Sequence, residues 1–179
     1  IYSRNTNPTV RAFEDKVKEL ESAQAATSFA SGMAAISNTL ATFLKPGDRV
    51  VSIKDSYVGT NVIFNEFLPP LNIIVSLCET GDYDQIETEI AKGATLLDLE
   101  TPTNPNIKIT DIKRLSAAAK KVGAHVVVDN TSATPINQNP ILPGADITLH
   151  SASKYLGGHA DALGAVSYTH LTLPTTPYV

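Results

Sequence analysis

The chain has 179 residues, of which 42% are hydrophobic and 18% are charged, and its net charge is −4. These values are typical of a globular protein, and the length suffices for one domain, or a large part of one. The acidic balance gives no reason to expect a nucleic acid or a membrane as partner, and neither a spanning segment nor a signal peptide is visible. The single cysteine, Cys78, cannot form an internal disulfide, and we predict a cytoplasmic location.

Apolar, β-branched runs alternate along the chain with stretches of helical spacing. Residues 1–10 are polar and predict an extended arm. Helices are predicted at residues 10–21, 32–44, 57–68, 83–91 and 111–122, and strands at residues 25–29, 49–53, 73–77, 95–99, 125–129 and 145–150. This alternation is typical of an α/β domain with a mostly parallel sheet and helices on both faces. Such sheets bind their ligands at the carboxyl ends of the strands.

Lys154 carries the strongest chemical signal. It follows the predicted strand at residues 145–150, with Ser151 and Ser153 before it and two glycines after it. A lysine that is kept dry can lose its proton and form a Schiff base with an aldehyde. The serines can bind a phosphate, and the glycines let a flat ring approach. A lone lysine in a polar loop is more often a surface residue, so the other motifs must decide.

Asp129 ends the apolar run at residues 125–129. A carboxylate at the carboxyl end of a strand can hold a heterocyclic nitrogen in its protonated form, although a loop cap explains an isolated aspartate equally well. Pyridoxal phosphate (PLP) needs a lysine at its aldehyde and an acid at its pyridinium nitrogen, so that its ring can act as an electron sink. PLP is therefore the predicted cofactor.

Further candidates follow other strand ends. Ser31, Gly32 and Met33 lie where a strand gives way to a helix, and the free N–H groups of a helix N-terminus bind phosphate. A plain helix cap is the alternative interpretation of these residues.

Three polar or aromatic residues in other loops complete the set. Tyr57 follows the strand at residues 49–53, where its ring can stack on a planar ligand. An ordinary half-buried tyrosine explains that position equally well. Asn104 and Thr131 are polar residues in loops after strands, and each carries little signal alone.

Five motifs occur in one order along the chain: Tyr2–Thr9, Ser31–Ile36, Glu100–Pro105, Val128–Thr131 and Ser151–Tyr155. Together they resemble the PLP-dependent trans-sulfuration enzymes of cysteine and methionine metabolism. That family includes cystathionine γ-synthase, the cystathionine lyases, methionine γ-lyase and the O-acylhomoserine sulfhydrylases. The resemblance implies the large domain of the fold type I PLP-dependent transferases. We expect an arm segment at residues 1–10 and an incomplete, truncated PLP-binding domain at residues 11–166.

The resemblance also implies a role for each candidate. Lys154 would hold the cofactor and shuttle protons, Asp129 would pair with the pyridinium nitrogen, and Tyr57 would stack on the ring and serve as a base. The other cofactor contacts would come from Tyr2, Arg4, Ser31, Gly32, Met33, Asn104, Thr131, Ser151 and Ser153. Asn104 would contact the ring hydroxyl. Tyr2 and Arg4 would reach the phosphate of a neighbouring subunit in a homo-oligomer, a dimer of dimers.

The implied activity is elimination or replacement on a small amino-acid substrate, either a sulfur amino acid or O-acylhomoserine. Cystathionine γ-synthase or γ-lyase activity is favoured, with O-acetylhomoserine sulfhydrylase or methionine γ-lyase as alternatives. Gly59 stands where methionine γ-lyases usually carry a cysteine and argues mildly against the last. A nucleotide-binding module would need a Gly-x-Gly-x-x-Gly motif, which residues 31–36 do not match. An inactive α/β fragment is the remaining alternative, and no metal-ligand spacing is visible.

Residues 167–179 depart from the family pattern and are rich in threonine and proline. We expect them to be an artefactual tail, and a genomic sequence that encodes them in frame would refute this. The family's small C-terminal domain, which supplies the arginine for the substrate carboxylate, is expected to be absent from the chain. A polypeptide without that arginine is not expected to turn over substrate, even where the whole protein does.

Overall fold

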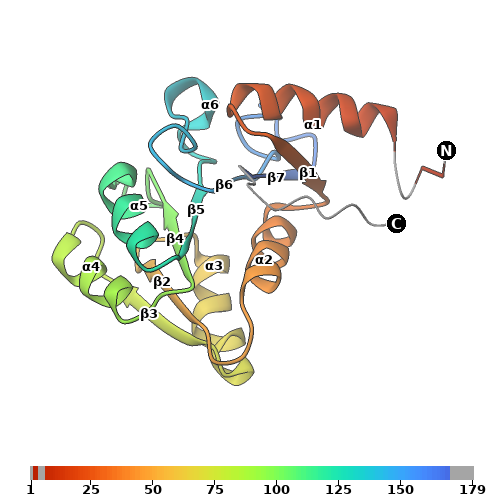
Figure 1. The fold of residues 1–179 in the computed structure, drawn as a ribbon. Helices are drawn as coiled ribbons and strands as arrows, with labels where there is room; N and C mark the ends of the chain where they lie inside the picture. The colour runs from red at the N-terminus through yellow and green to blue at the C-terminus, as the bar shows by residue number, and fades with distance from the viewer. Residues whose placement is uncertain (1, 4–6, 170–179) are drawn as a thin grey trace.

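The computed structural model describes residues 2–3 and 7–169. Within these residues, seven strands form one sheet in the order β1-β7-β6-β5-β4-β2-β3 (Figure 1). The strands are β1 (Ala25–Phe29), β2 (Arg49–Ile53), β3 (Ile74–Cys78), β4 (Leu96–Glu100), β5 (His125–Asp129), β6 (Ile147–His150) and β7 (Ala165–Thr169). Strands β3, β2, β4, β5 and β6 are parallel, whereas β7 runs antiparallel to both β6 and β1. The sheet is therefore mostly parallel, as predicted.

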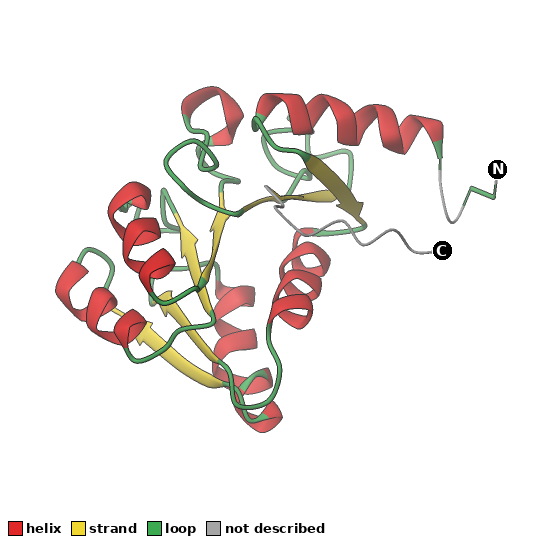
Figure 2. Ribbon diagram, in the orientation of Figure 1, coloured by secondary structure: helices red, strands yellow, loops and turns green. Residues whose placement is uncertain are grey.

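Helices cover both faces of the sheet, with α4 and α5 on one face and α2 and α3 on the other (Figure 2). The helical segments are α1 (Pro8–Leu20), α2 (Gly32–Phe43), α3 (Val58–Val62), η1 (Ile63–Phe67), η2 (Pro69–Leu71), α4 (Tyr83–Ala91), α5 (Ile112–Lys121) and α6 (Thr134–Asn137). The single helix predicted at residues 57–68 is instead α3 followed by the π-helical turn η1. No helix of the described residues is long and apolar enough to cross a bilayer.

Polar side chains begin several of the helices. The Asn7 side chain accepts a hydrogen bond from the Thr9 backbone N–H at the start of α1. Asp111 accepts one from the backbone of α5 in the same way. Such caps satisfy N–H groups that have no acceptor within the helix. They explain why α5 begins within one residue of its predicted start and why α1 begins at Pro8, within the predicted extended arm and two residues before its predicted start.

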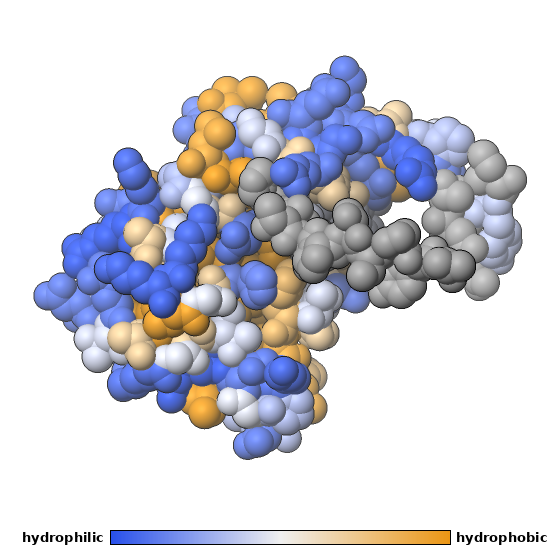
Figure 3. Space-filling model, viewed as in Figure 1, coloured by the Kyte–Doolittle hydropathy of each residue, from blue (hydrophilic) through white to orange (hydrophobic). Residues whose placement is uncertain are grey.

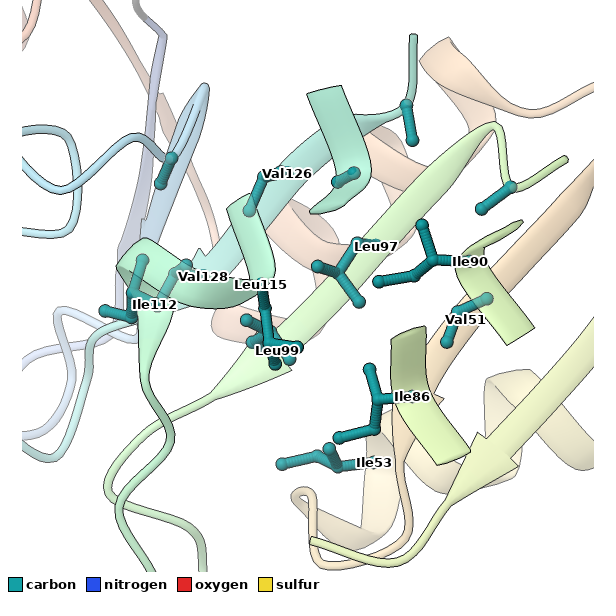
Figure 4. Close-up of a cluster of buried hydrophobic side chains, with 14 of the residues drawn as sticks. Val51, Ile53, Ile86, Ile90, Leu97, Leu99, Ile112, Leu115, Val126 and Val128 are labelled. Atoms are coloured by element: carbon teal, nitrogen blue, oxygen red, sulfur yellow. The ribbon is translucent and has the colours of Figure 1, made fainter. Parts of the chain in front are cut away.

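The larger hydrophobic cluster lies between the sheet and the helices α4 and α5 (Figure 4). Leu97 and Leu99 of β4 point into it and meet Ile86 of α4 and Leu115 of α5, and all four side chains are fully buried. Burial of an aliphatic side chain of this size contributes about 1.5–3 kcal/mol. This cluster therefore provides much of the stability that holds the strand ends in register.

The second cluster lies on the opposite face of the sheet, under α2 and η1. Leu96 of β4 and Val127 of β5 point into it. Since side chains alternate along a strand, Asp98 and Glu100 share the face of Leu96, and Asp129 shares the face of Val127. The strand pattern thus gathers three acidic side chains on the face of the sheet that α2 and α3 cover.

An apolar groove of about 780 Å³ runs between α2 and the segment from Gly59 to Ile73. Apolar side chains gather over α2 and α3 in Figure 3. Met33 at the start of α2 and Gly59 in α3 line one part of this groove. The groove therefore adjoins the carboxyl edge of the sheet.

Strand β7 extends across the boundary expected at residue 166. Ser167 pairs with Thr27 of β1 and with Leu149 of β6, so the first residues of the expected tail belong to the sheet. Ser167 also lies within hydrogen-bond distance of Thr39 of α2. The rest of that tail, residues 170–179, lies outside the described residues.

Candidate functional site

The carboxyl ends of five strands meet at one edge of the sheet. Strands β2, β4, β5 and β6 are parallel, and β1 shares their direction because two successive antiparallel pairings through β7 relate it to β6. The loops that follow these strands carry Gly32, Tyr57, Asn104, Asp129 with Thr131, and Ser151 with Lys154. The fold therefore places the predicted residues at the edge where parallel sheets bind ligands.

One carboxylate oxygen of Asp129 accepts hydrogen bonds, and the other is available to a ligand. Its Oδ1 accepts hydrogen bonds from the backbone N–H and the hydroxyl of Thr131, at 2.9 Å and 2.5 Å. No described residue donates a hydrogen bond to Oδ2. Burial raises the pKa of the Asp129 carboxyl, while the Thr131 bonds and the nearby His150 oppose that rise. The open oxygen is suited to a cationic N–H partner, which would favour the charged carboxylate.

A second group of residues forms a cradle at the start of α2. Ser31 caps the helix through its hydroxyl, which accepts a hydrogen bond from Ala34 N at 3.2 Å. A Cβ atom at Gly32 would lie only 2.9 Å from Ser151 Cβ, so only glycine lets this turn approach the loop after β6. The first N–H groups of a helix lack an intrahelical acceptor and attract anions. Helix α2 therefore offers an anion site with Ser151 beside it.

Thr131 joins the acid to the cradle. Its hydroxyl donates to Asp129 and accepts the backbone N–H of Ser151 at 2.9 Å. Strands β5 and β6 are neighbours, with Asp129 opposite Leu149. One threonine side chain thus fixes the loop after β6 relative to the carboxylate, and this role explains a residue whose sequence signal was weak.

Tyr57 lies on the other side of the cradle. It is the residue before α3, and 40% of its surface is exposed. A Cβ atom at Gly59 would lie 2.7 Å from Tyr57 Cε1 and 2.6 Å from Met33 Sδ. The tyrosine ring, Gly59 and the first turn of α2 are therefore packed together, with part of the ring left open to a ligand.

Lys154 and Ser153 both lie in the loop after β6, but their side chains differ in their contacts. Lys154 is exposed, and its Nζ atom makes no ion pair or hydrogen bond with a described residue. The Ser153 hydroxyl donates to Gly164 O at 3.2 Å and accepts from Gly164 N at 3.0 Å. Ser153 therefore braces the loop, whereas Lys154 is available at the edge of the sheet.

The structure does not test the remaining predicted contacts. Asn104 is exposed in the loop after β4 and bonds to no described residue. Tyr2 is 59% exposed near the N-terminus. Arg4 lies outside the described residues. Their roles stay predictions.

The chain matches, over residues 1–173, the model of a family described as Cys/Met metabolism PLP-dependent enzymes. The chain belongs to this family. Membership confirms the predicted family, fold class and cofactor, and PLP is the cofactor of these enzymes. The match also extends beyond residue 166, where the sequence pattern was expected to leave the family.

Named relatives agree with this membership. The chain is 45% identical over 168 residues to a cystathionine gamma-lyase of Bacillus subtilis. The aligned region covers 94% of the chain and 44% of that protein. It is 41% identical to an L-methionine gamma-lyase of Fusobacterium nucleatum, with 97% and 44% covered. The chain therefore spans less than half the length of these relatives.

Solved structures of the family share the fold. A cystathionine gamma synthase from Xanthomonas oryzae superposes with a TM-score of 0.92 at 35% identity, covering 96% of the chain and 44% of that structure. A cystathionine gamma-lyase from Lactobacillus plantarum gives a TM-score of 0.91 at 38% identity, covering 95% and 44%. The arrangement of the sheet and helices is thus that of the family.

The residues at the carboxyl edge fit PLP. The open Oδ2 of Asp129 suits the ring N–H, and the N-terminus of α2 suits the phosphate. Among the described residues, no group of three or more His, Cys, Asp or Glu side chains is placed to hold a metal ion. The carboxylate of Asp129 and the N-terminus of α2 together suit an anionic cofactor with a basic nitrogen.

A buried network supports the two loops that carry Asp129 and Ser151. Glu21, at the end of α1, is fully buried, and its Oε1 accepts a hydrogen bond from Asn130 Nδ2 at 2.8 Å. The same oxygen lies 2.5 Å from His150 Nε2. Since Asn130 follows Asp129 and His150 precedes Ser151, Glu21 ties α1 to both loops. The sequence pattern did not reveal this contact.

Two further acids near the site were also missed. Asp98 accepts a hydrogen bond from the Ser52 hydroxyl at 3.1 Å, and burial, aided by the charge of Asp129, raises its pKa to about 7. Burial and the charge of Asp129 raise the pKa of Glu100 to about 8, against the hydrogen bond from Tyr57 N. Glu100 ends an apolar run as Asp129 does, so the same signal was present for it.

Replacing Asp98 by asparagine is expected to stabilise the protein at high pH. The folded state keeps the Asp98 proton up to about pH 7, whereas the unfolded chain releases it near 3.8. The free energy of unfolding therefore falls as pH rises between these values, and asparagine, which still accepts from Ser52, avoids the loss. The gain at about pH 9 is at most on the order of 4 kcal/mol, from about 1.4 kcal/mol per pKa unit.

Urea unfolding at about pH 5 and about pH 9 measures this difference. The exposed Asp84 serves as the control, because Asp84→Asn should leave the pH dependence unchanged. An Asp98→Asn variant with the same pH dependence as the wild type would contradict a neutral Asp98 in the folded state.

Proposed function

We propose that this chain forms the PLP site of a trans-sulfuration enzyme, a lyase or γ-replacement enzyme of the cystathionine γ-synthase or γ-lyase type. The observation that carries the proposal is the link from Asp129 through Thr131 to Ser151 and Gly32. It sets an acid with an open oxygen and an anion-binding helix N-terminus at one edge of the sheet, as PLP requires. The family match supports it.

Each residue then has a defined task. When bound, PLP supplies a ring that stabilises negative charge at the substrate Cα atom. Asp129 Oδ2 holds the proton of the ring nitrogen, and the Gly32 and Met33 N–H groups orient the phosphate. Lys154 Nζ takes and returns protons at Cα and Cβ. Tyr57 covers one face of the site, keeps water away from it, and acts as a base on the substrate.

The substrate is proposed as a sulfur amino acid or an O-acylhomoserine. Relatives named cystathionine gamma-lyase, methionine gamma-lyase and cystathionine beta-lyase match at 40–45% identity, values too close to select one activity. Gly59 favours a cystathionine enzyme over a methionine γ-lyase, with O-acetylhomoserine sulfhydrylase as the alternative. Turnover of cystathionine, methionine and O-acetylhomoserine by the full-length gene product separates these activities.

Assembly and location stay predictions. We propose a homo-oligomer, a dimer of dimers, in which Tyr2 and Arg4 reach the phosphate of the neighbouring subunit. A cytoplasmic location is proposed for the same enzyme. Sedimentation of the full-length protein with and without PLP tests the assembly.

The direct test of the site is incubation with PLP, reduction with borohydride and peptide mass spectrometry. We expect a pyridoxyl adduct concentrated on Lys154, both in this chain and in the full-length gene product. Adducts spread evenly over surface lysines in both proteins would refute the proposed site.

Replacing Asp129 by asparagine is expected to weaken PLP binding. A hydrogen bond to a charged group contributes about 1.5–3 kcal/mol, so Kd should rise roughly 10- to 100-fold. Equilibrium titration of the cofactor absorbance measures the change. Asp146, which accepts Val126 N at the opposite edge of the sheet, provides the matched control. If Asp129→Asn and Asp146→Asn bind PLP equally well, Asp129 does not face the ring nitrogen.

A further inference from the structure

The start of helix α3 depends on a side chain from another strand. Tyr57 precedes this five-residue helix and offers it no side-chain cap. Its own backbone N–H donates a hydrogen bond to Glu100 Oε2, 43 positions further along the chain. Helix α3 continues directly into η1, and a helical segment this short has little stability of its own, so its direction is set by contacts to the rest of the fold.

Glu100 is itself firmly placed. It is the last residue of β4, it is 6% exposed, and it lies opposite Asp129 in the β4–β5 register. The next residue, Thr101, is fully buried, and its hydroxyl accepts Thr110 N at 2.9 Å. The carboxyl group thus extends from a rigid strand end toward the backbone of Tyr57.

We propose that Glu100 is a positioning residue that fixes the ring of Tyr57 over the cofactor site by holding the Tyr57 backbone N–H beside Asp129. The inference rests on the proposed function, because it assigns the ring its place toward PLP. Gly59 and Met33 pack close to the ring of Tyr57 and limit where that ring can lie. The hydrogen bond to Glu100 fixes the backbone of the same residue, and the two constraints together restrict the positions that the ring can take.

The neighbours of Glu100 explain why a glutamate can do this without disturbing Asp129. Burial, together with the charge of Asp129 on the same face, raises the pKa of Glu100 to about 8, so its carboxyl is mostly neutral near neutral pH. A neutral acid still accepts the Tyr57 N–H through its carbonyl oxygen. Glutamine has the same length and the same acceptor, whereas aspartate is one methylene too short to reach.

Three variants distinguish the effect of side-chain length from the effect of the carboxyl group: Glu100→Gln, Glu100→Asp and Glu100→Ala. Hydrogen exchange of the Tyr57 amide in the cofactor-free protein reports the bond directly. We expect exchange close to that of the wild type in Glu100→Gln and about tenfold faster or more in Glu100→Asp and Glu100→Ala. A fluorotyrosine label, assigned with Tyr57→Phe, should show a broadened Tyr57 fluorine signal in the same two variants.

Glu14 provides the matched control, because its carboxylate accepts the Ser28 backbone N–H at 2.7 Å in β1, which β7, β6 and β5 separate from β4 in the sheet. Glu14→Ala should leave the exchange of the Tyr57 amide unchanged. Unchanged exchange in Glu100→Asp, or equal acceleration in Glu100→Gln and Glu100→Asp, would overturn the proposal. If Glu100→Ala does not fold, the glutamine and aspartate variants still decide.

The PLP-bound protein supplies a second measurement. Glu100→Asp should lower the visible circular dichroism of the bound cofactor while the Lys154 adduct still forms, and Glu100→Gln should restore it. Absence of the Lys154 adduct in the wild type would refute the proposed function, and the exchange measured without cofactor would still decide the role of Glu100.

Discussion

Replacing Lys154 by alanine is expected to abolish the borohydride-fixed adduct at residue 154 and to lower α-proton exchange by about 10²–10⁴-fold in the full-length protein. The reason is that Lys154 is the one lysine of the loop after β6, at the edge where the acid and the helix N-terminus meet. Its exposed side chain leaves Nζ free to reach a ligand there. No other described amine replaces it in that loop.

Proton exchange at the substrate Cα, followed by NMR in deuterated water, measures the loss. Lys121, an exposed lysine in the last turn of α5, provides the control, because Lys121→Ala should keep both the adduct and the exchange. Since Lys154→Ala can still bind PLP without a covalent bond, cofactor absorbance alone does not decide. Wild-type exchange in Lys154→Ala would move the proton transfer to another residue.

Replacing Glu21 by alanine is expected to lower the free energy of unfolding by about 3–5 kcal/mol. Glu21 and His150 are 0% and 1% exposed, so the change removes a buried carboxyl group and deprives both His150 and Asn130 of an acceptor. Removing one partner of a buried hydrogen-bonded pair lowers the free energy of unfolding because the remaining polar groups cannot bond to water instead. A loss of this size is a large part of the stability of one domain.

Urea unfolding followed by far-UV circular dichroism gives the difference. Glu19 lies on the same helix and is exposed, so Glu19→Ala should change stability by no more than about 0.5 kcal/mol. Equal effects of Glu21→Ala and Glu19→Ala would show that the buried contact does not hold α1 to the sheet.

Much of the fold could be predicted from the sequence, because fully buried parallel strands leave continuous apolar runs. The strands that end at Ile53, Glu100 and Asp129 were found in this way, to within one residue. Strand β7 was missed because its five residues include polar side chains and it follows a long loop. Its place between β1 and β6 is decided by pairing, which no local pattern records.

The candidate site was predictable where a residue ends an apolar run. Asp129 was found for that reason, and Glu100 had the same signal but was grouped with the loop that follows it. The bond from Tyr57 to Glu100 and the contact of Glu21 with His150 join residues 43 and 129 positions apart. Such contacts depend on strand register and helix packing, so they appear only in the folded structure.

The position of β7 also has a consequence for the order of folding. Strand β1, which leads into the start of α2, joins the sheet only through β7, the last strand of the described chain. During synthesis, the segment with Gly32 leaves the ribosome long before its neighbour in the sheet exists. Pairing between strands so far apart in the sequence is slow, and apolar surface stays exposed to solvent until it is complete. The phosphate cradle should therefore be among the last parts of the domain to form, and the nascent chain is most exposed to aggregation and chaperones during that interval.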